Sequence, residues 1–146
     1  MIHRNSNNFI VVDKQWLIRL KNDAKQSEKQ MARLLMHHAV NDYVQEMLIA
    51  FTDQCNIKPN HSENKTESLQ VLEGELLLTI FNEQGKVLEE IEMGPVGSSK
   101  PFLYRFHSSP WHTMSAKTPE VVVHEILQGP FVKVEEKEPE WLKQYV

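Results

Sequence analysis

Alternating apolar residues over positions 68–81 are the feature that most constrains the fold. In this stretch, SLQVLEGELLLTIF, apolar side chains recur at alternate positions on both sides of a break at Glu73-Gly74. A two-residue period places successive side chains on opposite faces of a β-strand, so the stretch predicts two half-buried strands. Residues 82–85 carry the composition of a hairpin turn, in which Gly85 can take a positive φ angle.

The same pattern of short strands and turns continues along the chain. Gly- and Pro-containing loops separate the strands, which is typical of tight reversals of chain direction. Many short strands at close intervals indicate an antiparallel sandwich or barrel, and therefore an all-β protein. The further strands are predicted at residues 31–36, 43–51, 86–93, 102–106 and 121–126.

One helix is expected before the strands. Trp16, Leu20 and Ala24 have helical spacing, and Asp13 stands where an N-cap residue is expected. The helix is expected to end near Ser27. It precedes the strand-rich part of the chain and is the one helical segment with a clear apolar stripe.

The chain is expected to fold as a single unit, because its 146 residues contain no internal repeat or linker. Within this unit we expect a helical lead-in over residues 1–30, a β-barrel over 31–134 and a C-terminal tail over 135–146. The acidic tail, KVEEKEPEWLK, is interpreted as a solvated face.

Composition excludes several classes of partner. The formal net charge of -4 gives no electrostatic reason to expect nucleic acid or an anionic membrane. No apolar run approaches the ~20 residues of a membrane span, and the first residues lack the apolar core of a signal peptide. Cys55 is the single cysteine, which fits a reducing compartment, so we expect a cytoplasmic protein.

Five segments in a fixed order resemble one known family: NKTES, VLEGEL, IFNEQGKV, YRF…WHT and HEILQGPF. They resemble the cupin-fold metalloproteins of the WbuC type, and RLLMHHAVNDYVQEMLIAF is similar to the N-terminal part of that family. The resemblance implies a cupin double-stranded β-helix, a jelly-roll barrel, preceded by one α-helix. Because genes of this family lie in bacterial O-antigen and capsule clusters, it also implies a role in surface-polysaccharide biosynthesis. A homodimer is expected by analogy with the fold.

The resemblance also implies a metal site, which this chain keeps only in part. In cupins the first motif has the form Pro-His-x-His, then Glu, then Gly. Alignment on the last two residues places Asn60 and Ser62 at the histidine positions, with His61 between them. Glu67 corresponds to the motif's glutamate, and His112 matches the later histidine of the family. Only Glu67 and His112 of the implied set are ordinary ligands of transition metals.

Three interpretations of this site stay open. In the first, a β-bulge at residues 60–61 turns His61 inward, so that His61, Glu67 and His112 hold a divalent metal such as Zn, Ni, Fe or Mn. In the second, there is no metal, and the polar pocket binds a small polar or sugar-like ligand by hydrogen bonds. In the third, the pocket is vestigial and the chain is a structural subunit.

Glu67 and His112 are the predicted catalytic residues. If the chain is an isomerase or epimerase, one of them is the general acid or base, because proton transfer beside a sugar carbonyl needs a group that titrates near neutrality. Arg105 is expected to hold the negative charge of a sugar nucleotide, since a guanidinium forms two hydrogen bonds with an anion. The sequence leaves open whether the chain is an enzyme or a binding module.

Further polar residues are expected around the pocket. His37 corresponds to a histidine of the family. His124 and Glu125 face opposite sides of a strand, so one of them points into the barrel. A buried charge there needs a partner such as Arg105 or Arg33, or it contacts substrate. The predicted substrate-binding residues are Asn60, Ser62, Tyr104, Arg105, His37 and Glu125.

Overall fold

The computed structural model describes residues 1–132 and 137–145, which fold into two β-sheets with a helix on the outside. One sheet has six strands in the order β1-β2-β3-β9-β4-β7, and the other has three in the order β6-β5-β8. The elements are β1 (Ile2–Arg4), α1 (Lys14–Gln26), β2 (Met31–Leu35), β3 (Val44–Thr52), β4 (Thr66–Glu73), β5 (Leu76–Phe81), β6 (Val87–Met93), β7 (Leu103–His107), β8 (Trp111–Ala116), β9 (Glu120–Gln128) and the 3-10 helix η1 (Glu140–Tyr145).

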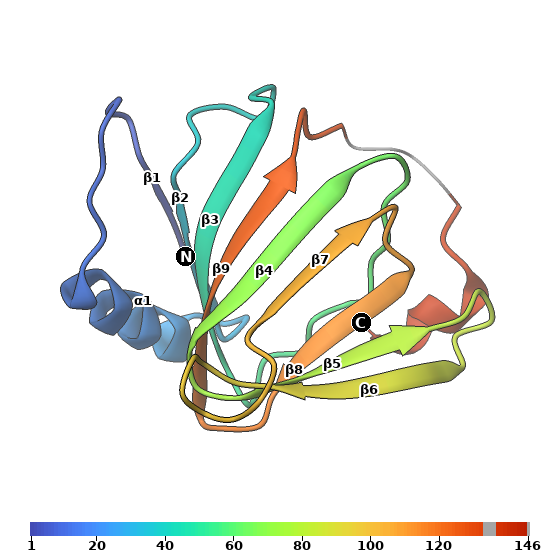
Figure 1. The fold of residues 1–146 in the computed structure, drawn as a ribbon. Coiled ribbons are helices and arrows are strands. Elements are labelled where there is room, and N and C mark those ends of the chain that lie inside the picture. The colour runs from blue at the N-terminus through green and yellow to red at the C-terminus, as the bar shows by residue number, and fades with distance from the viewer. Residues whose placement is uncertain (133–136, 146) are drawn as a thin grey trace.

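The six-stranded sheet has a different layer on each face. Helix α1 lies on one side of it and the three-stranded sheet lies on the other (Figure 1). Leu20 and Ala24 of α1 are buried against one face, whereas Leu76 and Leu78 of β5 pack against the other. Residues 121–123 of β9 are therefore buried on both faces, which explains why this run is continuously apolar.

The two sheets form an open sandwich, which corrects the expected barrel. Within the described residues, no strand of one sheet pairs with a strand of the other. At the edges β7 and β8, side chains make the contact instead of the backbone: the Phe106 ring lies 5.0 Å from the His112 ring.

The local elements follow the sequence pattern closely. Asp13 is the N-cap of α1, and its carboxylate accepts a hydrogen bond of 2.9 Å from the backbone N–H of Gln15. Strand β2 occupies the segment expected at 31–36. Gly85 has a φ angle of 81° in the turn between β5 and β6, as the hairpin prediction requires.

Both ends of the described chain are tied to the sheets. Strand β1 pairs in parallel with β2, so the first thirty residues are not helical alone. Leu142 of η1 is buried against Phe81 and Trp111, so the C-terminal segment is not only a solvated face. The expected boundary between β-domain and tail, at residues 134 and 135, lies outside the described residues. No helix in the described part of the chain is long and apolar enough to cross a membrane.

Candidate functional site

A cavity of about 820 Å³ opens between the two sheets. Its polar wall comes from β4, β7, β8 and β9, and its rim comes from the loop before β4 and from the segments that follow β9. The lining residues are Ile57, Lys58, Pro59, Asn60, His61, Ser62, Glu63, Asn64, Lys65, Glu67, Tyr104, Trp111, His112, Thr113, Met114, Glu125, Leu127, Phe131, Val132, Glu138 and Leu142.

Strand register decides which polar side chains reach this cavity. Leu69 of β4 lies opposite Tyr104 of β7 and opposite Glu125 of β9, and paired residues of antiparallel strands share a face. Leu69 belongs to the core between the sheets, so Tyr104 and Glu125 point the same way. Arg105 is exposed, and strand alternation directs it to the outer face. Arg105, which was predicted to contact a ligand, therefore does not line this cavity.

Glu67 and His112 come together at the buried end of the cavity. Each is only 7% exposed, and His112 Nε2 lies 3.5 Å from Glu67 Oε1. His112 Nδ1 lies 2.8 Å from the carbonyl oxygen of Pro110, which can only accept a hydrogen bond. The Nδ1–H group therefore donates to Pro110, and Nε2 is left to face Glu67 and the cavity.

Burial raises the pKa of the other two acidic groups of the polar wall. For Glu125, burial and then the negative charge of Glu67 raise the pKa, the positive charge of Arg33 lowers it, and the result is a pKa of about 7. Burial also raises the pKa of Tyr104, with smaller effects from Glu67 and Glu125. Near neutral pH the Tyr104 hydroxyl is thus a hydrogen-bond donor, and Glu125 can give or take a proton.

Three of these groups keep unused hydrogen-bonding capacity. Among the described residues, neither the carboxylates of Glu67 and Glu125 nor the hydroxyl of Tyr104 forms a hydrogen bond with another residue. Buried polar groups are normally satisfied by protein, water or ligand. Their common orientation into one cavity makes this wall suited to a hydrogen-bonding ligand.

Asn60 and Ser62, which stand at the histidine positions of the cupin motif, lie at the rim of the cavity in the segment before β4. Asn60 exchanges backbone hydrogen bonds of 3.0 and 2.9 Å with His112, so their side chains share a face. The Oγ atom of Ser62 lies 3.1 Å from Ser109 Oγ. The His61 ring lies 4.0 Å from the Trp111 ring, and Trp111 faces the side of β8 opposite to His112.

The donor set does not fit a tight transition-metal site. No group of three or more His, Cys, Asp or Glu residues with metal-binding geometry occurs among the residues described. Glu67 and His112 converge, but His61 lies against Trp111 and does not complete the set. Zinc and related ions require three or four such ligands for tight binding. Two donors leave such an ion weakly held.

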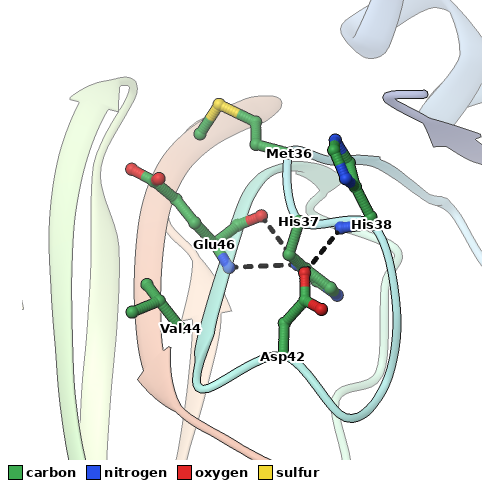
Figure 2. Close-up of a pocket in the computed structure, with 6 residues that line it drawn as sticks. All are labelled: Met36, His37, His38, Asp42, Val44 and Glu46. Carbon is green, nitrogen blue, oxygen red and sulfur yellow. Dashed lines mark hydrogen bonds between the residues drawn. The ribbon is translucent and has the colours of Figure 1, made fainter. Parts of the chain in front are cut away.

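His37 belongs to a different part of the molecule. It lines a small depression of about 220 Å³ with Met36, His38, Asp42 and Glu46 (Figure 2). Its Nδ1 atom lies 3.0 Å from the backbone N–H of Glu46, which donates to it. The ring thus extends the pairing of β2 and β3 past the end of β2. The prediction that His37 contacts a ligand in the cavity between the sheets is therefore not supported.

His124 also lies outside the cavity. Its Nε2 atom is 2.7 Å from Glu46 Oε2 on the outer face of the sheet. Of the pair His124 and Glu125, Glu125 is thus the one that points inward. Arg33 acts electrostatically on Glu125 from β2, and its Nε atom is buried without a hydrogen-bond partner in the described structure.

The apolar part of the cavity lining was not predicted from the sequence. Leu127 follows Glu125 by two residues on β9, so alternation could have indicated it once Glu125 was known to face inward. Phe131 and Val132 lie beyond the strand, at the rim, where no periodic signal exists. Met114 and Ile57 complete this apolar side.

Solved structures that align with this chain show its fold. A cupin superfamily protein from Desulfitobacterium hafniense DCB-2 aligns with a TM-score of 0.53 at 18% identity, over 70% of this chain and 80% of that chain. The Cnp3 cupin domain of Schizosaccharomyces pombe aligns with a TM-score of 0.53 at 9% identity, over 69% and 66%. KdgF from Halomonas sp. aligns with a TM-score of 0.52 at 14% identity, over 70% and 81%.

The chain therefore has a cupin fold. The family model described as Domain of unknown function (DUF6016) matches residues 12–93, and the chain belongs to this family. No curated protein sequence matches the chain. At such low identities the structural matches establish the fold alone, so the function has to be argued from the cavity.

Proposed function

We propose that this cupin-fold chain binds a sugar or sugar derivative in the cavity between its sheets, and that it serves bacterial surface-polysaccharide synthesis. The observation that carries the proposal is the environment of Glu67, which is 7% exposed and lines the cavity without a hydrogen bond from another described residue. The resemblance to the WbuC type supplies the biological context. A carboxylate so placed is an acceptor for ligand hydroxyl groups.

The mixed lining of the cavity supports a sugar-like ligand. Glu67, Tyr104, His112 and Glu125 offer acceptors and donors, and the apolar side chains of Met114 and Leu127 lie beside them on the same strands. A sugar ring presents both hydroxyl groups and apolar C–H faces. Ligand sites typically combine an apolar wall with a few polar groups that fix orientation, and their volumes of roughly 300–1,000 Å³ include that of this cavity.

The polar wall also supports acid–base chemistry. Glu125, with its pKa raised to about 7, can exchange a proton with a ligand near neutral pH. His112 Nε2 can accept a proton from the cavity side, because Nδ1–H is oriented by the Pro110 carbonyl. Such groups suit the removal of a proton next to a sugar carbonyl, as in an isomerase or epimerase. The alternative is a binding module that uses the same contacts without turnover.

The test is a binding and exchange experiment on the full chain. Monosaccharides and nucleotide sugars would be screened by ligand-observed NMR in D2O, which reports both binding and replacement of carbon-bound protons by deuterium. We expect binding that Glu67→Gln weakens at least about ten-fold, while the outward-facing Arg105→Ala leaves it unchanged.

Each outcome separates the candidate functions. Deuterium exchange that is lost in His112→Ala and Glu125→Gln supports an enzyme. Binding without exchange in any ligand supports a non-catalytic binding module. The absence of binding by every compound in the screen overturns the proposal and favours a structural subunit. Binding that Glu67→Gln leaves unchanged overturns the placement of the ligand against Glu67.

The proposal also includes a cellular compartment and an oligomeric state. The single cysteine and the polysaccharide context favour the cytoplasm, and the cupin fold favours a homodimer. Light scattering on the purified chain measures its mass directly. A mass near 17.1 kDa at micromolar concentration contradicts the dimer.

A further inference from the structure

The charges around the cavity are unevenly distributed. Its described lining contains four acidic side chains but only two lysines, and no arginine. The two most deeply placed acids, Glu67 and Glu125, lie on the polar wall, and the charge of each acts on that wall. The four acidic residues are Glu63, Glu67, Glu125 and Glu138, and the two lysines are Lys58 and Lys65.

Neither lysine is available to a ligand without breaking an existing contact. Lys58 Nζ forms an ion pair with Glu138 Oε1 at the rim. Lys65 Nζ donates a hydrogen bond to the carbonyl oxygen of Pro130. Both lysines therefore hold the rim segments together and offer little charge to the interior.

The arginines do not supply the missing positive charge. Arg105 points to the outer face of the sheet. Arg33 is close enough to Glu125 to lower its pKa, but it does not line the cavity. His112 is the one basic group at the polar wall, and its Nε2 atom already faces Glu67. Among the described lining residues, a phosphate group that entered this space would meet carboxylates and no lysine or arginine that is free of an existing contact.

The polar wall is instead suited to groups that donate hydrogen bonds. The Glu67 carboxylate has only acceptor sites, and no described residue donates to it. Hydroxyl groups of a neutral ligand can fill these sites without adding charge. Phosphate oxygens are negatively charged and only accept hydrogen bonds. Beside Glu67 they would therefore repel its negative charge and would have no hydrogen to donate to its oxygens.

The rim has a different character from the polar wall. Phe131 and Val132 are 59% and 62% exposed, and both line the opening of the cavity. A ligand whose hydroxyl-rich end lies against Glu67 would thus place its other end among apolar side chains. This arrangement favours a compact sugar or a glycoside with an apolar substituent over a nucleotide.

We infer that the cavity selects neutral, hydroxyl-bearing ligands, such as free sugars and simple glycosides, and excludes sugar phosphates and nucleotide sugars. This inference rests on the proposed function, and it narrows the class of ligand. A neutral ligand also needs no arginine in the cavity to balance a negative charge.

The inference is tested with matched pairs that differ only in charge. Glucose, galactose and N-acetylglucosamine would each be titrated beside their 1-phosphates and their uridine diphosphate derivatives, with dissociation constants measured by NMR or calorimetry. We expect each neutral sugar that binds to bind at least about ten-fold more tightly than its phosphorylated forms.

The variants make the electrostatic origin testable. The double variant Glu67→Gln/Glu125→Gln removes the charge of Glu67 and the partly ionised carboxyl of Glu125 with little change in shape. The preference for the neutral member of each pair should therefore fall by at least about three-fold. Glu46→Gln is the matched control, because Glu46 pairs with His124 on the outer face. It should leave the preference unchanged.

The outcomes distinguish this inference from the proposed function. If a nucleotide sugar binds as tightly as the neutral sugar or more tightly, and Glu67→Gln weakens that binding, the exclusion of anions is overturned while sugar binding stands. If the preference for neutral sugars persists in the double variant, its electrostatic basis is overturned. If no compound of either charge binds, both proposals fail.

Discussion

His112 presents its Nε2 atom to Glu67 Oε1 at 3.5 Å, while its Nδ1 atom lies 2.8 Å from the carbonyl oxygen of Pro110. The Pro110 carbonyl therefore orients the His112 ring, and the oriented ring presents Nε2 to Glu67 in the cavity. A second His–Glu pair, His124 with Glu46, has a shorter distance of 2.7 Å but lies partly exposed on the outer face. These two pairs allow the effect of burial to be measured.

The buried pair should couple more strongly than the exposed pair. We expect the double-mutant cycle of Glu67→Gln and His112→Ala to give a coupling of about 1–2 kcal/mol in the free energy of unfolding, because both groups lie in a region of low dielectric. The cycle of Glu46→Gln and His124→Ala should give less than about 1 kcal/mol. Urea unfolding of the variants measures both. Equal couplings would contradict the role assigned to burial.

Stability should fall as pH rises through the titration of Glu125. The folded chain keeps the Glu125 proton up to about pH 7, whereas the unfolded chain releases it near its ordinary pKa of 4.5. Between these values the folded state binds more protons, so the free energy of unfolding decreases with rising pH. Relative to Glu125→Gln, the wild-type chain should lose about 2–3 kcal/mol between pH 4.5 and pH 7.5.

Chemical denaturation across this pH range measures the effect. Glu63→Gln is the control, because Glu63 is an exposed rim residue, and its curve should run parallel to that of the wild type. If the free energy of unfolding of Glu125→Gln also changes with pH in parallel to that of the wild type, the raised pKa of Glu125 is wrong. Because protonated Glu125 is the stable form, Glu125→Gln should be the more stable protein above pH 7.

Gly85 should be far less tolerant of alanine than Gly97. Both have positive φ angles, 81° and 93°, but a Cβ atom at Gly85 would lie 2.4 Å from Trp141 Cδ2, whereas Gly97 has nothing within 4 Å. Gly97→Ala should cost about 1 kcal/mol from backbone strain alone. Gly85→Ala should cost about 2–4 kcal/mol, since it also displaces Trp141.

The displacement of Trp141 in Gly85→Ala can be detected separately by tryptophan fluorescence. Trp141 packs on Gly85 and donates a hydrogen bond to the Glu83 carbonyl, so its displacement should shift tryptophan fluorescence to longer wavelength. Gly97→Ala should leave the spectrum unchanged. Equal losses of stability in the two variants, with identical spectra, would show that η1 does not pack on this turn.

Histidines at the two motif positions should create a metal site, because the described residues bring only Glu67 and His112 together as ligands. Asn60 shares a face with His112, so Asn60→His places an imidazole beside Glu67 and His112. With Ser62→His as well, the double variant should retain about one equivalent of Zn or Ni after dialysis. The wild-type chain should retain less than about a tenth. Elemental analysis of protein purified without a histidine tag measures both.

His112→Ala in the double variant provides the control, because it should abolish the retained metal. Stoichiometric metal in the wild-type chain would contradict the expectation. It would mean that His61 or another side chain leaves its present position to complete the site with Glu67 and His112. That result would restore the first of the three interpretations of the sequence motif.

Local sequence patterns predicted most of the elements. The alternation over residues 68–81 corresponds to β4 and β5, and the hairpin turn at Gly85 is present. Asp13 begins α1 because its carboxylate satisfies a free backbone N–H group. These features depend on neighbours a few residues apart, so a single sequence contains the information that they need.

The candidate site could be predicted only in part. Glu67 and His112 were expected to converge by resemblance, and they do. Tyr104 and Arg105 were considered together, although alternation already places adjacent residues on opposite faces. Pairing of β7 with β4 decides that Tyr104 faces the cavity and Arg105 does not. The direction of the His61 side chain could not be predicted, because the chain before β4 is irregular. Packing against the Trp111 ring sets this direction in the structure.

The sequence alone determined most of the succession of strands, turns and helix, since backbone preferences and apolar periodicity act over short distances. It did not predict β1 or β8, which the structure adds. It also determined that two histidine positions of the cupin motif carry Asn60 and Ser62. The tertiary structure decided which polar side chains share a cavity, that the sheets form an open sandwich, and that the cavity wall is acidic. These properties arise from pairing between strands far apart in the chain, because only that pairing sets which residues face one another.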